Sequence, residues 1–187
     1  MIDTSSMDGQ FIQLFSYEEC ERITASGPTK ADITKTKDYI HTFLAQFGIT
    51  ITNERCIKHY IATESSKDSK EWHHDDVTIL NFIINIRGEG TRIFKDGSIH
   101  VLTQGQGCVM VGDQGYTMLG LPPTLHRGPP DDFNRYKLNI LVIPRNVITD
   151  QISGPSVCDS NCDLYKRRQI ELEKWLNEDL KKAESLI

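Results

Sequence analysis

The stretch from residue 78 to residue 86 (TILNFIINI) constrains the fold of this chain more than any other segment. It is mostly apolar, rich in β-branched residues, and too short to span a membrane. Such a run is typical of a strand that is buried on both faces of its sheet. A domain built around this strand therefore needs packing material on both sides.

Short β-rich runs continue before and after this stretch, and turn sequences separate them. The expected strands are 49–52, 56–62, 77–86, 92–94, 99–102, 107–111, 116–119 and 136–143. Between two of them, Asp96-Gly97 predicts a tight hairpin turn. Because no helical period interrupts this series, we expect an antiparallel sandwich or jelly roll and not a parallel sheet with crossover helices.

Helical patterns occur only near the two ends of the chain. Ser16 and Glu19 form a capping-box pattern that begins one helix, and Gly27 ends it. A second helix ends before Gly48, and its apolar residues recur at helical spacing. They are Ile33, Ile40, Phe43, Leu44 and Phe47. A third helix follows Asp163, and its apolar stripe predicts either docking on the sheet or a homodimer contact. The stripe consists of Leu172, Trp175, Leu176, Leu180 and Ala183.

The length of 187 residues suits a single domain with a substantial core. We expect a helical cover over residues 1–48, a jelly-roll core over 49–145, and a loop with the last helix over 146–187. The net charge of -5, without a basic stripe, argues against nucleic acid as an obligatory partner. We recognise no signal peptide and no membrane-spanning run, so we expect a soluble, cytoplasmic protein without a membrane partner.

Four consecutive side chains that can bind a metal ion precede the central strand. In an extended chain, residues i and i+2 project to the same side, so this stretch offers two overlapping imidazole–carboxylate pairs. The pairs are His73 with Asp75 and His74 with Asp76. His126, in a proline-rich loop, can approach from a neighbouring strand. Two imidazoles and one carboxylate on one face of an ion are the ligands of non-haem Fe(II) oxygenases. The competing interpretation is a solvated polar loop.

A basic residue follows His126 at the start of the last expected strand. Arg135 can hold a carboxylate through two parallel hydrogen bonds. Lys137 lies on the same face of that strand and is the alternative anion partner. Tyr60, in an earlier strand, can donate to a carboxylate or simply pack in the core. Together these residues predict an anion-binding group beside the metal centre.

One set of residues, in its order along the chain, resembles the His-x-Asp…His…Arg signature of the Fe(II)- and 2-oxoglutarate-dependent dioxygenase superfamily. The set consists of His73, Asp75, His126 and Arg135. Members of that superfamily commonly carry an aromatic residue directly before the first histidine, as Trp72 stands here. The resemblance therefore favours this pair over the overlapping pair that begins one residue later.

Two further segments extend the resemblance, which covers residues 12–145. Residues 88–91 (GEGT) are similar to the Gly-Gly-Thr turn of prolyl-hydroxylase-like members, and residues 15–20 (FSYEEC) to the N-terminal helix of that branch. The chain is also similar to an uncharacterised bacterial branch. The implied fold is mainly β with flanking helices: a double-stranded β-helix, the jelly roll shared with cupins.

The resemblance implies an enzyme that uses Fe(II), O₂ and 2-oxoglutarate, with ascorbate as an optional stimulant. It would hydroxylate a protein or peptide side chain or a small metabolite, and the sequence does not identify which. His73, Asp75 and His126 would be its metal ligands and catalytic residues. Arg135 would bind the co-substrate carboxylate, with Lys137 and Tyr60 as further candidates.

Two other classes of function remain open. One is a cupin-like metal-binding protein without 2-oxoglutarate chemistry, although the usual cupin His-x-His with a nearby glutamate is absent. The other is a metal-free module that binds a ligand at the mouth of the barrel. Three asparagines interrupt the buried strands, and their amides need hydrogen-bond partners, either from a co-substrate or from the core. These are Asn81, Asn85 and Asn139.

Overall fold

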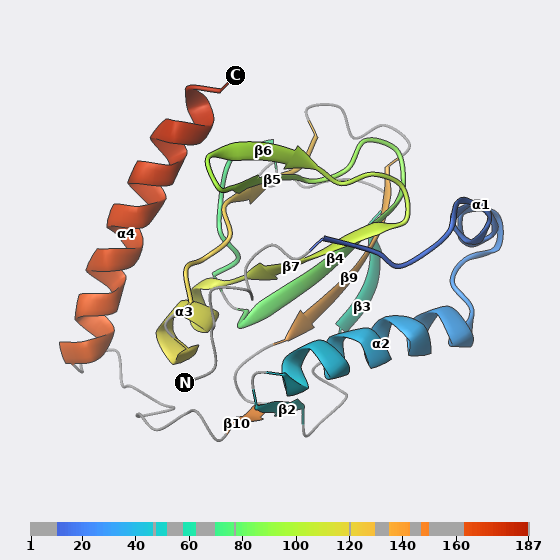
Figure 1. Ribbon diagram of the computed structural model, residues 1–187, viewed down its shortest axis with the longest axis horizontal. Helices are drawn as coiled ribbons and strands as arrows, with labels where there is room; N and C mark the ends of the chain where they lie inside the picture. Colours follow the sequence, from blue (N-terminus) through green and yellow to red (C-terminus); the bar gives the residue numbers. More distant parts are fainter. Residues whose placement is uncertain are drawn as a thin grey trace.

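The computed structural model describes residues 11–46, 48–51, 58–62, 70–76, 78–119, 121–129, 135–142, 147–149 and 163–186. Five strands form the largest sheet (Figure 1). In spatial order they are β1 (Phe11–Gln13), β7 (Gln106–Val111), β4 (Leu80–Arg87), β9 (Tyr136–Val142) and β3 (Lys58–Ala62). The expected central strand is thus β4, with a neighbour on each side.

Two smaller sheets complete the β structure. The three-stranded sheet has the order β6 (Ser98–Val101), β5 (Arg92–Lys95) and β8 (His126–Arg127). The two-stranded sheet pairs β10 (Val147–Thr149) with β2 (Ile49–Ile51). Every strand pairing within the described ranges is antiparallel, as expected. Strands β1, β8 and β10 were not anticipated.

The hairpin between β5 and β6 has the predicted turn. Asp96 and Gly97 both have positive φ values, 51° and 74°, and Lys95 faces Ser98 across the turn. Two consecutive positive φ values define the hairpin turn that Asp-Gly favours, because its twist matches that of the strands.

Two capped helices cover the outer face of the large sheet. In α1 (Tyr17–Ser26) the Ser16 hydroxyl accepts from the Glu19 amide and the Glu19 carboxylate from the Ser16 amide, as predicted. Helix α2 (Lys30–Ala45) begins with a second capping box, Thr29 with Asp32. Apolar residues of both helices pack in one core with those of β4 that face them. From β4 these are Leu80, Phe82, Ile84 and Ile86.

The segment from 116 to 119, expected to be a strand, belongs instead to helix α3 (Asp113–Leu119). The amides at its start donate to carbonyls of the preceding loop, Asp113 to Asp75 (2.9 Å) and Gln114 to Thr78 (3.1 Å). Backbone groups used in this way cannot pair with a neighbouring strand, so the chain coils directly after β7. The expectation that no helix interrupts the strands between 56 and 143 is therefore wrong.

Helix α4 (Asp163–Glu184) begins where predicted and stands beside the three-stranded sheet and α3 (Figure 1). Leu176 and Ala183 of its apolar stripe pack with Phe94 and Leu125, which confirms docking for this part of the stripe. The side chains of Leu172 and Trp175 lie outside the described residues, as does all of Phe47. None of the described helices is long and apolar enough to cross a membrane.

The space between the two larger sheets has an apolar part and a polar part. The apolar part contains Ile83, Ile93, Leu102, Cys108 and Met110. Side chains alternate along a strand, so this face of β4 and β9 also carries Asn81, Asn85, Lys137 and Asn139, together with the apolar Leu141. The register pairs Asn85 with Lys137 and Ile83 with Asn139 across these strands. The polar part therefore contains the asparagines and the lysine that the sequence predicts near the candidate site.

Candidate metal centre

His73 and His126 lie directly opposite each other in an isolated antiparallel bridge. Their backbones exchange two hydrogen bonds, His73 N to His126 O at 2.9 Å and the reverse at 3.0 Å. The ring centroids are 4.4 Å apart. Next to the bridge, the Arg127 guanidinium lies 4.8 Å from the centroid of the Trp72 ring, within cation–π range. Backbone pairing thus brings together two histidines that are far apart in sequence.

Both imidazoles are held through Nδ1. The Nδ1 atom of His73 lies 2.7 Å from the Glu71 carbonyl oxygen, and that of His126 lies 3.0 Å from the Thr124 carbonyl oxygen. A carbonyl oxygen only accepts hydrogen bonds, so each Nδ1 carries a proton, and Nε2 is the nitrogen of each ring that is left to bind a metal ion. Carbonyls that fix the tautomer in this way are the usual supports of metal-binding histidines.

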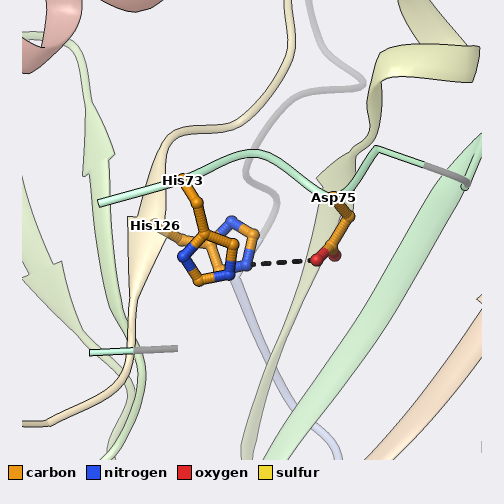
Figure 2. A group of neighbouring side chains, drawn as sticks. All are labelled: His73, Asp75 and His126. Carbon is orange, nitrogen blue, oxygen red and sulfur yellow. Dashed lines mark ion pairs between the residues drawn. The ribbon is translucent and has the colours of Figure 1, made fainter. Parts of the chain in front are cut away.

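Asp75 completes the trio (Figure 2). Its Oδ1 atom lies 3.6 Å from Nε2 of His126, and its Oδ2 atom accepts a hydrogen bond from Asn81 Nδ2 at 2.7 Å. One ligand atom from each of His73, Asp75 and His126 lies within 4.8 Å of the others. The three side chains are therefore close enough to share one metal ion.

The overlapping pair points elsewhere. His74 is almost fully buried, and its Nδ1 atom contacts Oδ1 of Asp113, at the start of α3, at 3.3 Å. Asp76 is exposed to solvent. Of the two pairs that the sequence left open, only the one formed by His73 and Asp75 meets His126.

Burial sets the protonation state of His126, whose residue exposure is only 5%. Loss of hydration lowers its pKa to about 4, against the opposing influence of the Asp75 carboxylate. The imidazole is therefore neutral at physiological pH, which is the form that binds a metal ion.

Arg135 is buried, with only 3% of its surface exposed. Its Nη2 atom donates to the hydroxyl of Thr91. Thr91 belongs to the GEGT turn, so this turn connects directly to the predicted anion partner, a connection that the sequence did not reveal. The arginine is thus oriented before any ligand arrives.

Lys137 and Tyr60 are placed by the strand register. Lys137 of β9 lies opposite Asn85 of β4. Its pKa is lowered to about 8, mainly by burial and to a smaller extent by the positive charge of Arg135. Tyr60 of β3 lies opposite Asn139 of β9, and its side chain is outside the described part of the chain.

Asn81 is the site residue whose role sequence reasoning missed. From the sequence it is only a polar interruption of a buried strand, whose amide needs a partner from a co-substrate or from the core. In the structure its amide instead donates to the carboxylate of Asp75, one of the three candidate metal ligands. A useful signal was available: an asparagine on the buried strand that immediately follows the His-x-Asp pair.

No protein-family model matches this sequence, and no curated protein matches it. Similar solved structures include two that share 14% sequence identity with this chain. The crystal structure of the dioxygenase for auxin oxidation (DAO) in rice matches over 89% of this chain and 67% of its own, with a TM-score of 0.38. A putative oxygenase from Shewanella oneidensis matches over 79% of this chain and 65% of its own, with a TM-score of 0.39. Both scores are low, so neither similarity assigns an activity to this chain.

Proposed function

We propose that this protein is an Fe(II)- and 2-oxoglutarate-dependent dioxygenase that acts as a hydroxylase. The observation that carries the proposal is the trio of His73, Asp75 and His126, with the open donor atoms turned toward one another. Two imidazoles and a carboxylate that meet on one side of an ion leave its opposite side available to other molecules.

The arrangement of strands supports a jelly roll, the finer fold that the resemblance implies. Four neighbouring strands of the large sheet, β3, β9, β4 and β7, face a smaller sheet of β8, β5 and β6. The His73 segment adds to the edge of this smaller sheet through its bridge to β8. Two facing four-stranded antiparallel sheets are the pattern of an eight-stranded jelly roll.

The donor set also fits iron chemically. Neutral imidazoles and one carboxylate suit Fe(II), although other divalent ions bind such sites as well. When bound, Fe(II) with O₂ and 2-oxoglutarate supplies the oxidation, in which a C–H bond becomes C–OH and 2-oxoglutarate becomes succinate and CO₂. The protein contributes the ligands, their orientation and the surrounding pocket.

Arg135 is the residue that favours 2-oxoglutarate over other metal ligands. If the keto-acid end of 2-oxoglutarate bound the metal, its second carboxylate would need a cationic partner when buried. Arg135 is buried and already oriented by Thr91. Lys137, two residues further along the chain, provides a second cation, and it is close enough to Asp75 for their charges to interact.

The substrate class stays open between a protein or peptide side chain and a small metabolite. The cytoplasmic location and the homodimer through α4 also stay predictions.

A titration with metal and co-substrate tests the proposal. Mn(II) is titrated into metal-free protein by calorimetry, and 2-oxoglutarate is then titrated with and without Mn(II). We expect Mn(II) to bind, and 2-oxoglutarate to bind only when Mn(II) is present. The His126→Ala variant should bind neither Mn(II) nor 2-oxoglutarate. The His100→Ala variant, changed at an exposed histidine of β6, should bind both. Metal binding without 2-oxoglutarate binding would favour the cupin-like alternative, and no metal binding would favour a metal-free module.

A further inference from the structure

We propose that Asn81 is a positioning residue that makes Asp75 a one-oxygen metal ligand and so keeps one coordination position open for the reaction. The inference rests on the proposed function, because it concerns the positions that 2-oxoglutarate and O₂ need. Asn81 does not touch the reacting atoms in this account. It acts through the carboxylate that it holds.

The two oxygens of Asp75 have different surroundings. Oδ1 faces the histidines and lies 3.6 Å from Nε2 of His126. Oδ2 accepts a 2.7 Å hydrogen bond from Asn81 Nδ2. A carboxylate oxygen accepts hydrogen bonds, so the side of the Asn81 amide that faces it must be the NH₂ group. Oδ1 is therefore the oxygen that faces the histidines, and Oδ2 is the oxygen that Asn81 holds.

Asn81 is well suited to hold the carboxylate in place. It lies in β4, the central strand, opposite Met110 of β7 and Leu141 of β9, and it is 4% exposed. The backbone of Asp75 is held as well, because its carbonyl accepts the Asp113 amide at 2.9 Å. The carboxylate is thus fixed at the main chain and at Oδ2, which leaves little freedom to rotate.

This restraint matters because the coordination sphere is limited. In the proposed reaction, 2-oxoglutarate and O₂ would need all the positions that a metal held by three protein ligands leaves open. If both oxygens of Asp75 bound the ion, one of these positions would be filled. Turning Oδ2 toward the ion would draw it away from Asn81 Nδ2 and weaken a hydrogen bond between a charged oxygen and a buried amide.

The test compares Asn81→Leu, which keeps the size of the side chain but removes the donor, with Asn139→Leu as the matched control. Asn139 is equally buried, at 2% exposure, on the same side of the neighbouring strand β9. Asn81→Ala serves as a second variant, and thermal melting followed by circular dichroism shows whether each protein is folded. The measurements are Mn(II) affinity by calorimetry and the visible absorption spectrum of the Co(II)-saturated proteins.

We expect the Asn81 variants to bind Mn(II) about 10- to 100-fold more weakly, as for other residues that support metal ligands, and Asn139→Leu to bind like the wild type. At saturating Co(II), the spectrum of the Asn81 variants should differ from the wild-type spectrum, whereas the control should match it. A residue needed only for stability would lower affinity without changing the spectrum of the saturated protein.

Wild-type Mn(II) affinity together with an unchanged Co(II) spectrum in a folded Asn81 variant would overturn the inference. That outcome is separate from failure of the proposed function. If the Asn81 variants behave as expected but the wild-type protein does not bind 2-oxoglutarate, the role of Asn81 stands and the dioxygenase does not. A wild-type protein that binds no metal would overturn both.

Discussion

Replacing Arg135 by methionine removes the cation to which we assign the second carboxylate of 2-oxoglutarate. The guanidinium is 3% exposed and hydrogen-bonded to Thr91, so a carboxylate that meets it loses its water. Removing one partner of a buried, hydrogen-bonded ion pair costs about 3–5 kcal/mol. At about 1.4 kcal/mol for each factor of ten, the affinity for 2-oxoglutarate should fall by more than about a hundredfold.

The assay is calorimetric titration of 2-oxoglutarate into Mn(II)-saturated protein. Mn(II) affinity itself should be nearly unchanged in Arg135→Met, because Arg135 donates to Thr91 and is not one of the three candidate metal ligands. Arg92→Met is the control: it removes the same charge from a residue that is paired with Glu89 near the surface. It should bind 2-oxoglutarate like the wild type.

Equal 2-oxoglutarate affinity in the wild type and in Arg135→Met would refute this reasoning. The same titration with Lys137→Met then shows whether Lys137, the alternative anion partner, holds the carboxylate instead.

Three further predictions follow from individual side chains. Asp75→Ala should abolish Mn(II) binding in a calorimetric titration, whereas Asp76→Ala, at an exposed position, should leave it intact. Asp32→Asn should lower the free energy of unfolding by about 2 kcal/mol at neutral pH, because a hydrogen bond from Arg22 is the main cause that lowers the Asp32 pKa to about 2. Since that stabilisation requires the ionised carboxylate, the difference in urea unfolding should disappear as the pH falls from about 4 through 2. Lys137→Met should raise the free energy of unfolding by up to about 3 kcal/mol at pH 7, because burial lowers the lysine pKa to about 8 and the charged form is therefore disfavoured in the folded protein. This gain should shrink as the pH rises from about 8 to above 10, where the unfolded lysine also loses its proton. Greater stability of the wild type at pH 7 would contradict the last prediction.

Local signals in the sequence predicted local structure well. The capping box of Ser16 and Glu19 involves residues three apart, so the start of α1 could be read directly. The same holds for the turn at Asp96-Gly97, whose positive φ values suit these residues. The strand β4 was evident because its apolar run is long enough to be buried on both faces.

Contacts between distant segments decided what the sequence could not. The residues of 116–119 favour a strand, yet they form part of α3, whose first amides bond to Asp75 and Thr78 in a loop far upstream. Strand β1 is short and exists through its pairing with β7, where Phe11 lies opposite Cys108. Neither partner could be recognised from the local sequence.

In the candidate site, too, some features follow from local sequence and others depend on contacts between distant segments. The order of His73, Asp75, His126 and Arg135 indicated the chemistry, because residue type and spacing along strands are local properties. The choice between the two overlapping His-x-Asp pairs depended on Asp113, which engages His74 from the start of α3.

The central claim is that the trio forms a metal centre that consumes 2-oxoglutarate. The most direct measurement is the formation of succinate from 2-oxoglutarate in air with Fe(II) and ascorbate, followed by nuclear magnetic resonance, for the wild type and for Asp75→Ala. Our account predicts succinate that depends on Fe(II), O₂ and the wild-type protein, and none with Asp75→Ala. Wild-type protein that binds Fe(II) but leaves 2-oxoglutarate intact would contradict it.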